Sequence, residues 1–293
     1  MKIGIINIES GYSIMNLLTY DIVRELIHNH HEVYSIEEKT NVKQFLEEDL
    51  VTWRSYGGNL LRCYSDKDPY QLSSSDLSIF DTLIVMGGEN GHRFFQHVTN
   101  QFKIKSLFIP VSIYNEMTES KQSLGYDSAL NAIIEDVFKI EDTISSCRYE
   151  QFRLFGIQVP GIEGSLLARD VADAMGGLLR YWDVETTEDL SLLVDKKIKS
   201  GNNHSFIIFD ERVKLSMVEK KLQPVLADVS WKVSKFDEAQ CMGASPTASD
   251  RILAKKIASG VISWVESSED AGMLTLEDNK ASFKDCNLSL EKN

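Results

Sequence analysis

The chain has 293 residues, with 31 lysines and arginines against 44 aspartates and glutamates, a net charge of −13 at pH 7. This length allows one large or two ordinary domains with a sizeable core, and 43% apolar residues exclude a disordered chain. The acidic balance argues against nucleic acid or an anionic membrane as a partner, because both need a concentrated positive face, and it leaves small anionic ligands open.

Cysteine spacing and the amino terminus bear on compartment. The four cysteines form neither a CxxC pair nor a cysteine–histidine ligand pattern, which disfavours zinc and a disulfide framework. The first residues lack the apolar run of a signal peptide, and no stretch approaches about 18 consecutive apolar residues. We therefore expect a cytoplasmic protein with no membrane association.

Strand and helix patterns alternate from the start of the chain. Residues 2–8 are a β-branched run typical of a buried strand, residues 15–29 place apolar side chains at helical spacing, and residues 32–36 resemble a second strand. This order predicts a βαβ unit with a right-handed crossover onto a parallel sheet. Further strands are expected at residues 80–86, 104–110, 152–157 and 204–209.

Two long helices are expected further along the chain. Residues 126–146 carry apolar side chains three or four positions apart, which predicts a helix facing the core. A second helix is expected to begin at residues 245–247, with Ser245 as its cap and Pro246 at its first position. The sequence becomes polar and acidic after Glu266, and we expect the last ten residues to be weakly ordered.

Candidate site residues follow two of the predicted strands. Gly87 and Gly88 permit a tight turn on which a phosphate could rest at a helix amino terminus, with a purely structural turn as an equal alternative. The next strand ends before Tyr114, Asn115 and Glu116. Open parallel sheets bind ligands at such ends, and the alternative here is an ordinary polar loop.

Two other patterns are better explained by structure than by chemistry. His28, His30 and His31 lie close together, but their spacing does not place three imidazoles on one ion, so a solvated loop is favoured over a metal site. Residues 245–250 hold a serine and an aspartate without a neighbouring histidine. Helix capping explains them better than a hydrolase triad.

Three segments resemble the 6-phosphofructokinase family. Residues 124–131 (LGYDSALN) and 140–146 (IEDTISS) are similar to that family's GFDTALN and KIRDTATSH patterns. Residues 243–254 (GASPTASDRILA) are similar to its GGSPTAFDRxLA segment. The matches are in the family's order, and the resemblance covers roughly residues 1–265.

The resemblance implies a fold, an activity and an assembly. The expected fold is α/β with two domains, each a mainly parallel sheet flanked by helices, usually in a symmetric oligomer. The family transfers the terminal phosphoryl group of ATP, or of pyrophosphate in one branch, to the 1-hydroxyl of fructose 6-phosphate. We expect a larger nucleotide-side domain from residues 1–125 and 240–265, and a smaller sugar-side domain from residues 126–239 and 266–293.

The catalytic positions differ from the family's pattern. The family's base is the first aspartate of a TIDND motif, and residues 112–116 read SIYNE, which places Tyr114 there. A phenol, with an ordinary pKa of about 10, is a poor proton acceptor at neutral pH. Glu116 replaces the motif's last aspartate, and Glu89 replaces the aspartate that the family associates with magnesium.

The ligand positions implied by the resemblance are also altered. A glutamate and a serine replace the paired glycines of the family's first turn, and Arg62 lies near a phosphate-binding arginine but out of register. Tyr149 and Met242 stand at arginine positions of the sugar-phosphate site, whereas Glu211 is retained. Each lost hydrogen bond to a charged group costs about 1.5–3 kcal/mol. The resulting candidates for contacts with ATP are Gly11, Gly87, Gly88, Asn90 and Arg62, and those for the substrate cleft are Ser112, Tyr149, Glu211 and Met242.

Scaffold motifs remain while positions that touch phosphate or move protons are replaced. We therefore expect a divergent phosphofructokinase-like protein that lacks the family reaction and acts as a non-catalytic binding or regulatory protein. One alternative is a phosphotransferase of altered specificity that uses ATP or pyrophosphate with magnesium. Another is a structural subunit of a homo- or hetero-oligomer. The expected partners are a second copy or another protein, together with an unidentified small ligand.

Overall fold

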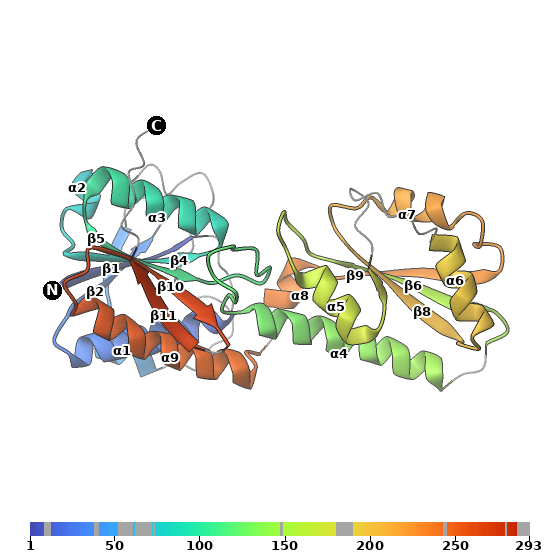
Figure 1. Cartoon of the computed structure of the whole chain (residues 1–293). Helices are drawn as coiled ribbons and strands as arrows, with labels where there is room; N and C mark the ends of the chain where they lie inside the picture. The colour runs from blue at the N-terminus through green and yellow to red at the C-terminus, as the bar shows by residue number, and fades with distance from the viewer. Residues whose placement is uncertain are drawn as a thin grey trace. The chain divides into compact units, whose positions relative to one another are not determined.

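The computed structural model describes residues 1–8, 13–37, 41–51, 61, 72, 74–146, 149–179, 190–242, 245–278 and 280–285. The chain divides into two compact units (Figure 1). The first comprises Met1–Ser128 and Met242–Asn293, and the second comprises Ala129–Cys241. Within the described part of the chain, none of the helices has the length and apolar character needed to cross a membrane.

The first unit is built on a seven-stranded sheet in the order β11-β10-β5-β4-β1-β2-β3. Its five central strands are parallel, and an antiparallel strand pairs at each edge. The carboxyl ends of the parallel strands therefore share one edge. The strands are β1 (Lys2–Ile8), β2 (Glu32–Glu37), β3 (Asn41–Gln44), β4 (Thr82–Gly87), β5 (Lys105–Pro110), β10 (Ala271–Glu277) and β11 (Lys280–Asp285).

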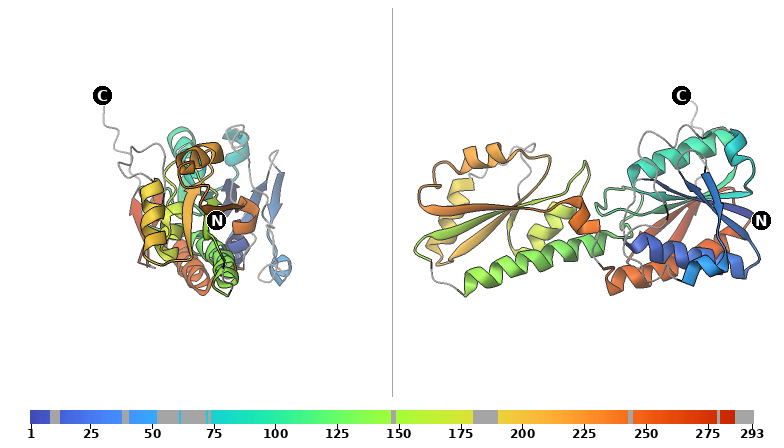
Figure 2. Two further views of the ribbon diagram at one scale, coloured as in Figure 1. Left: turned by 90° about the vertical axis from the view of Figure 1, so that its right-hand side faces the viewer. Right: turned by 180° about the vertical axis from the view of Figure 1, so that it is seen from behind.

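Helices cover both faces of this sheet. Figures 1 and 2 show α1 (Ser13–His28) and α9 (Ala248–Val265) packed together on one face, with α3 (Glu89–Phe102) and α2 (Ser74–Leu77) on the other. A short 3-10 helix, η2 (Glu47–Val51), follows β3. Phe94 and Phe95 of α3 and Phe108 of β5 are fully buried in one core cluster, and burial of each such side chain contributes about 1.5–3 kcal/mol.

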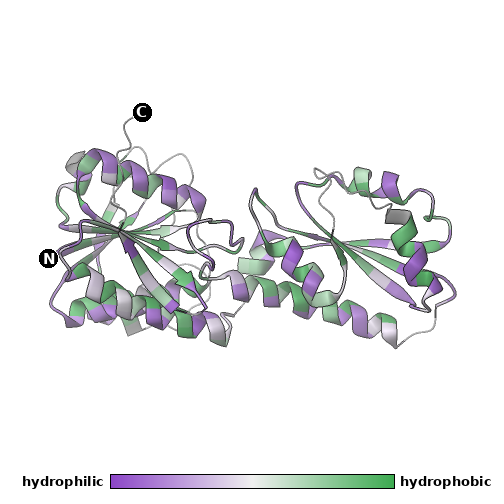
Figure 3. Cartoon of the chain, in the orientation of Figure 1, coloured by the Kyte–Doolittle hydropathy of each residue, from purple (hydrophilic) through white to green (hydrophobic). Residues whose placement is uncertain are grey.

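The second unit has a four-stranded parallel sheet in the order β7-β8-β6-β9. Alternating apolar and polar bands on α4 in Figure 3 reflect one helix face on the core and one in solvent. The strands are β6 (Phe152–Val159), β7 (Leu178–Leu179), β8 (His204–Asp210) and β9 (Val229–Lys235). The helices are α4 (Tyr126–Ser145), which begins in the first unit, α5 (Leu167–Met175), α6 (Leu190–Lys199), α7 (Leu215–Leu222) and α8 (Glu238–Met242).

A network that we call the helix junction joins the first turns of α4 and α9 within the first unit. It consists of Gly125, Asp127, Ser128, Thr247 and Asp250. The Asp250 carboxylate, which is 2% exposed, accepts the main-chain N–H of Ser128 at 2.9 Å, that of Gly125 at 3.2 Å, and the Ser128 hydroxyl. The Thr247 hydroxyl accepts the Asp250 N–H at 3.3 Å and donates to Asp127. Asp250 of α9 therefore caps the start of α4, while α9 is capped by its own Thr247.

Two sequence predictions are corrected by this architecture. Residues 266–293 were expected in the smaller domain, but β10 pairs in parallel with β5, and β11 pairs with β10. The hairpin of these two strands therefore completes the first unit's sheet. The predicted cap Ser245 lies outside the helix that it was expected to begin, because Thr247 is the N-cap of α9 and accepts the Asp250 N–H. The other predicted strands and long helices are present, with ends shifted by a few residues.

Candidate functional site

The carboxyl ends of β4 and β5 carry a group that we call the strand-end site: Gly88, Glu89, Ser112, Tyr114 and Glu116. β4 ends at Gly87, and Gly88 is the N-cap residue of α3, without a side chain to cap the helix. β5 ends at Pro110, and the chain continues into the segment that holds Ser112 and Glu116. Because β4 and β5 are neighbouring parallel strands, the two segments meet at one edge of the sheet.

The Glu116 carboxylate is the centre of the strand-end site. Its Oε2 accepts the Ser112 hydroxyl at 2.6 Å, and its Oε1 accepts the main-chain N–H of Glu89, in the first turn of α3, at 3.2 Å. Exposed N–H groups and the helix dipole make such a helix start attractive to anions. The anion present here is a side chain of the protein itself.

Both glycines of the preceding turn are closely packed, Gly87 against the main chain and Gly88 against the movable end of a side chain. A Cβ atom on Gly88 would lie 2.5 Å from Glu116 Oε1, and one on Gly87 would lie 2.6 Å from the carbonyl oxygen of Ile8. Contacts this short do not occur for real Cβ atoms. The geometry therefore gives the Gly87–Gly88 turn a structural purpose, which the sequence left as an equal alternative to phosphate binding.

Tyr114, at the position of the family's base, is 7% exposed. Its main-chain N–H donates to the Ser112 hydroxyl oxygen at 3.0 Å, which fixes the turn after β5. Asn115 follows in the left-handed region with φ of 53°. The Tyr114 side chain is therefore part of the packed first unit, a setting unlike that of a solvent-reachable proton acceptor.

Both carboxylates of this site have hydrogen-bond partners within the chain. Mg²⁺ is held by oxygen ligands in near-octahedral geometry, and carboxylates are its usual protein ligands. Glu116 is hydrogen-bonded as above, and Glu89 Oε1 accepts Arg93 Nε at 3.2 Å in a solvent-exposed pair. Across the described ranges, no group of three or more histidines, cysteines, aspartates or glutamates could hold a metal ion.

The second unit gathers carboxylates at the carboxyl end of β8. Asp210 is 1% exposed, and its Oδ2 pairs with the Arg212 guanidinium at 2.6 Å. Burial raises the pKa of the adjacent Glu211, and the nearby carboxylates Glu238 and Asp237 raise it further. The one retained residue of the family's sugar-phosphate site therefore lies in surroundings that disfavour another negative charge.

The remaining predicted site residues lie on other segments or beside the strand-end site. The Arg153 guanidinium lies 3.7 Å from the centroid of the Tyr149 ring, so this tyrosine is a stacking partner for a cation. Met242 ends α8, and Asn90 lies in the first turn of α3. Gly11 and Arg62 lie outside the described residues.

Sequence reasoning did not find two of the interactions at these positions. The Asp210–Arg212 pair and the Tyr149–Arg153 stack both join residues two to four positions apart. Neither pair lies within a single helix or strand, because β8 ends at Asp210 and β6 begins after Tyr149. The adjacency of Asp210 to the predicted Glu211 was the one available signal.

The sequence model of the family described as Phosphofructokinase matches residues 2–265. A protein of Macrococcus caseolyticus named ATP-dependent 6-phosphofructokinase is 27% identical over 290 residues, which cover 92% of this chain and 89% of that protein. A Staphylococcus carnosus protein of the same name is 29% identical over 259 residues, which cover 83% and 79% of the two chains.

Solved structures show the same fold. The phosphofructokinase of Pichia pastoris in the T-state superposes with a TM-score of 0.81 at 18% identity, covering 97% of this chain and 36% of that one. The pyrophosphate-dependent phosphofructokinase of Marinobacter aquaeolei superposes with a TM-score of 0.76 at 12% identity, covering 97% and 81%. These likenesses confirm the predicted α/β fold with mainly parallel sheets flanked by helices.

Proposed function

The chain belongs to the phosphofructokinase family, and on that premise we propose that it is a divergent member without the 6-phosphofructokinase reaction, acting as a non-catalytic binding or regulatory protein. The observation that carries the proposal is the Glu116 carboxylate, bonded to Ser112 and to the N–H of Glu89 at the start of α3. It fills, from within the chain, a helix start that would otherwise attract an anion.

The chemistry of phosphoryl transfer supports this proposal. The reaction needs a positioned acceptor, charge neutralisation by metal and cations, and a group that accepts the acceptor's proton. The buried Tyr114 stands at the position of the family's base, and the two carboxylates of the strand-end site are engaged within the chain. In the second unit, the carboxylates around Glu211 disfavour a sugar phosphate.

The proposal includes expectations for ATP, for magnesium and for protein partners. The curated relatives described above are named ATP-dependent, and for this chain we expect ATP to bind weakly and without help from magnesium. A binding or regulatory role requires a partner, which we take to be a second copy of the chain or another protein. Sedimentation as a strict monomer, together with failure to capture any protein, would count against that part.

The central test is an assay of the purified full chain with fructose 6-phosphate, magnesium, and ATP or pyrophosphate. The Macrococcus caseolyticus relative serves as a positive control. We expect no fructose bisphosphate from this chain under conditions in which the relative turns over. Product that disappears in Glu116→Gln, and persists in the exposed-residue control Glu119→Gln, would overturn the proposal.

One observation favours a second candidate, a phosphotransferase of altered specificity. The Glu116 carboxylate accepts the main-chain N–H of Glu89, so the two acidic residues that replace the family's aspartates are neighbours in space. Such an enzyme would use ATP or pyrophosphate with magnesium. Calorimetric titration of both, with and without magnesium, tests it, and the absence of any magnesium-dependent binding would count against it.

A further inference from the structure

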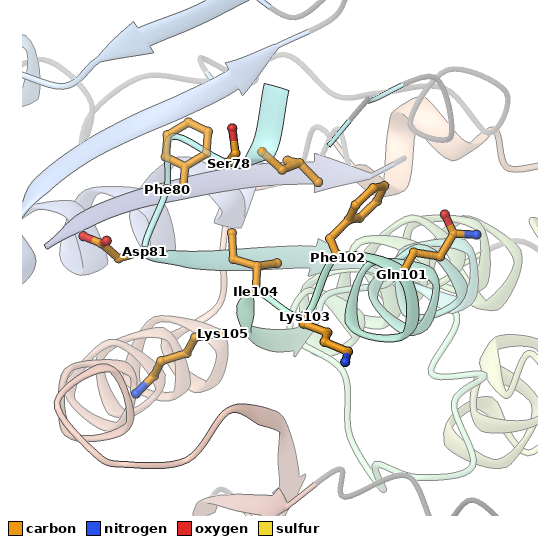
Figure 4. Close-up of a pocket in the computed structure, with 9 residues that line it drawn as sticks. Ser78, Phe80, Asp81, Gln101, Phe102, Lys103, Ile104 and Lys105 are labelled. Carbon is orange, nitrogen blue, oxygen red and sulfur yellow. The ribbon is translucent and has the colours of Figure 1, made fainter. Parts of the chain in front are cut away.

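A depression lies at the amino-terminal edge of the first unit's sheet, where β4 and β5 begin, opposite the edge that carries the strand-end site. Figure 4 shows this hollow, which we call the amino-edge pocket. Its volume is about 390 Å³, within the usual range for ligand pockets of about 300–1,000 Å³. It is lined by Leu77, Ser78, Phe80, Asp81, Gln101, Phe102, Lys103, Ile104 and Lys105.

The centre of the amino-edge pocket is apolar and aromatic. Leu77 and Phe80 are 1% and 6% exposed and belong to the core beneath α3, while Phe102 and Ile104 are partly buried against that core. In Figure 4 the rings of Phe80 and Phe102 lie on either side of Ile104. The face of an aromatic ring carries partial negative charge, so two rings around one hollow favour a cation with an apolar body.

The rim adds negative potential from two sources. The first is the exposed carboxylate of Asp81, one oxygen of which accepts the Lys2 main-chain N–H at 2.6 Å. The second is the carboxyl end of α3, where Lys103 adopts a left-handed conformation with φ of 48°. The carbonyl groups of the last turn of α3 give this end of the helix the negative end of its dipole.

The two lysines of the lining direct their amino groups away from the hollow. Lys105 Nζ donates to the carbonyl oxygens of Val265 and Ser267 at 2.9 and 2.6 Å and lies 4.7 Å from the centroid of the Trp264 ring. Figure 4 shows the side-chain nitrogens of Lys103 and Lys105 pointing away from the apolar side chains.

We propose that the amino-edge pocket binds organic ammonium ions with an aromatic or short alkyl body. The apolar body fills the space between Phe80, Phe102 and Ile104, and the ammonium group faces Asp81 and the carboxyl end of α3. The strand-end site lies at the other end of β4 and β5, so this ligand would be independent of any phosphate ligand of the family fold.

The test titrates the full chain with three probes of similar size and different charge: 2-phenylethylammonium, 3-phenylpropionate and 2-phenylethanol. Calorimetry gives the affinities, and amide shifts in nuclear magnetic resonance locate the site. We expect the ammonium ion to bind about tenfold or more tightly than the other two, with shifts at residues 101–105. Equal or tighter binding of the carboxylate or the alcohol, or no saturable binding of the ammonium ion, would overturn the proposal.

Two variants and a control identify the responsible groups. Asp81→Asn should reduce ammonium affinity about fivefold or more while leaving the affinity for 2-phenylethanol unchanged. Phe102→Leu keeps an apolar wall and removes one ring, so it should weaken ammonium binding more than alcohol binding. The control Asp173→Asn removes an exposed carboxylate of α5 in the second unit. If this control and Asp81→Asn weaken ammonium binding equally, the assignment of the pocket is wrong.

Discussion

The helix junction and the strand-end site share one interaction, a carboxylate that accepts N–H groups at a helix start, but the interaction has a different role in each. Asp250 accepts two main-chain N–H groups and a hydroxyl at 2% exposure, whereas Glu116, which is partly buried, accepts one main-chain N–H and one hydroxyl. The junction lies in segments that match the family's patterns, and the strand-end site lies where the chain departs from them. A retained carboxylate therefore holds the scaffold, and we propose that a substituted one occupies the place of a ligand.

The largest expected effect is at the helix junction. Asp250→Ala should lower the free energy of unfolding by about 3 kcal/mol or more, because three buried donors lose their acceptor and each costs about 1–3 kcal/mol. Urea unfolding followed by circular dichroism measures the change, with Asp173→Ala as the control for an exposed aspartate. A loss below about 1 kcal/mol would show that the junction is not what fixes these helix starts.

Glu116→Ala should cost less, about 1–2 kcal/mol, because the site is partly exposed and water can reach the donors that the substitution leaves. The same unfolding experiment applies, with Glu119→Ala as the matched control on the same segment. If Glu116→Ala proves more damaging than Asp250→Ala, the ranking of the two regions is reversed, and Glu116 becomes a scaffold residue.

A smaller effect concerns the pH dependence of the free energy of unfolding at the helix junction. Burial raises the pKa of Asp250 above its ordinary value of 3.8. The folded state then keeps a proton that the unfolded state has released, so the free energy of unfolding falls as pH rises from 3.8 through the raised pKa. Asp250→Asn should remove that part of the pH dependence, and Asp173→Asn should retain it. Parallel profiles for Asp250→Asn and the unmodified chain would contradict this prediction.

The smallest effect is expected at the rim of the strand-end site. Arg93→Ala breaks an i,i+4 ion pair with Glu89 whose side chains are 61% and 42% exposed. Exposed pairs of this kind contribute about 0.3–0.5 kcal/mol, so the urea midpoint should barely move. The small salt dependence that this ion pair adds to the midpoint should be lost. A loss above about 1 kcal/mol would mean that Glu89 is held for a purpose beyond the surface pair.

The sequence predicted the buried strands and long helices because their signals are local. Ile3, Ile5, Ile6 and Ile8 are fully buried in β1, and the stripe in residues 126–146 became α4 almost as expected. β9 was missed although its sequence, VSWKVSK, alternates apolar and polar residues with the period of a half-buried strand. The hairpin of β10 and β11 was assigned to the wrong domain because the strand that pairs with it lies far back in the chain.

The hydrogen bonds of the two sites join residues that lie far apart in the sequence. Glu116 and Glu89 are 27 positions apart, and Asp250 and Ser128 are 122 positions apart. The family resemblance marked Glu116 as a degenerate catalytic position, but it gave no sign that the Glu116 carboxylate would accept an N–H of the first turn of α3. The burial of Tyr114 was equally inaccessible, because a tyrosine after a strand is as often exposed as packed.

The placement of β10 and β11 also sets an order of assembly during synthesis. The second unit is one continuous stretch, residues 129–241, and all its strands have left the ribosome before β10 is made. The first unit begins earlier, yet β5 stays an open sheet edge until the chain has passed through the second unit and returned. The domain that starts first therefore finishes last, and the nascent protein carries an unpaired strand edge while its neighbour folds.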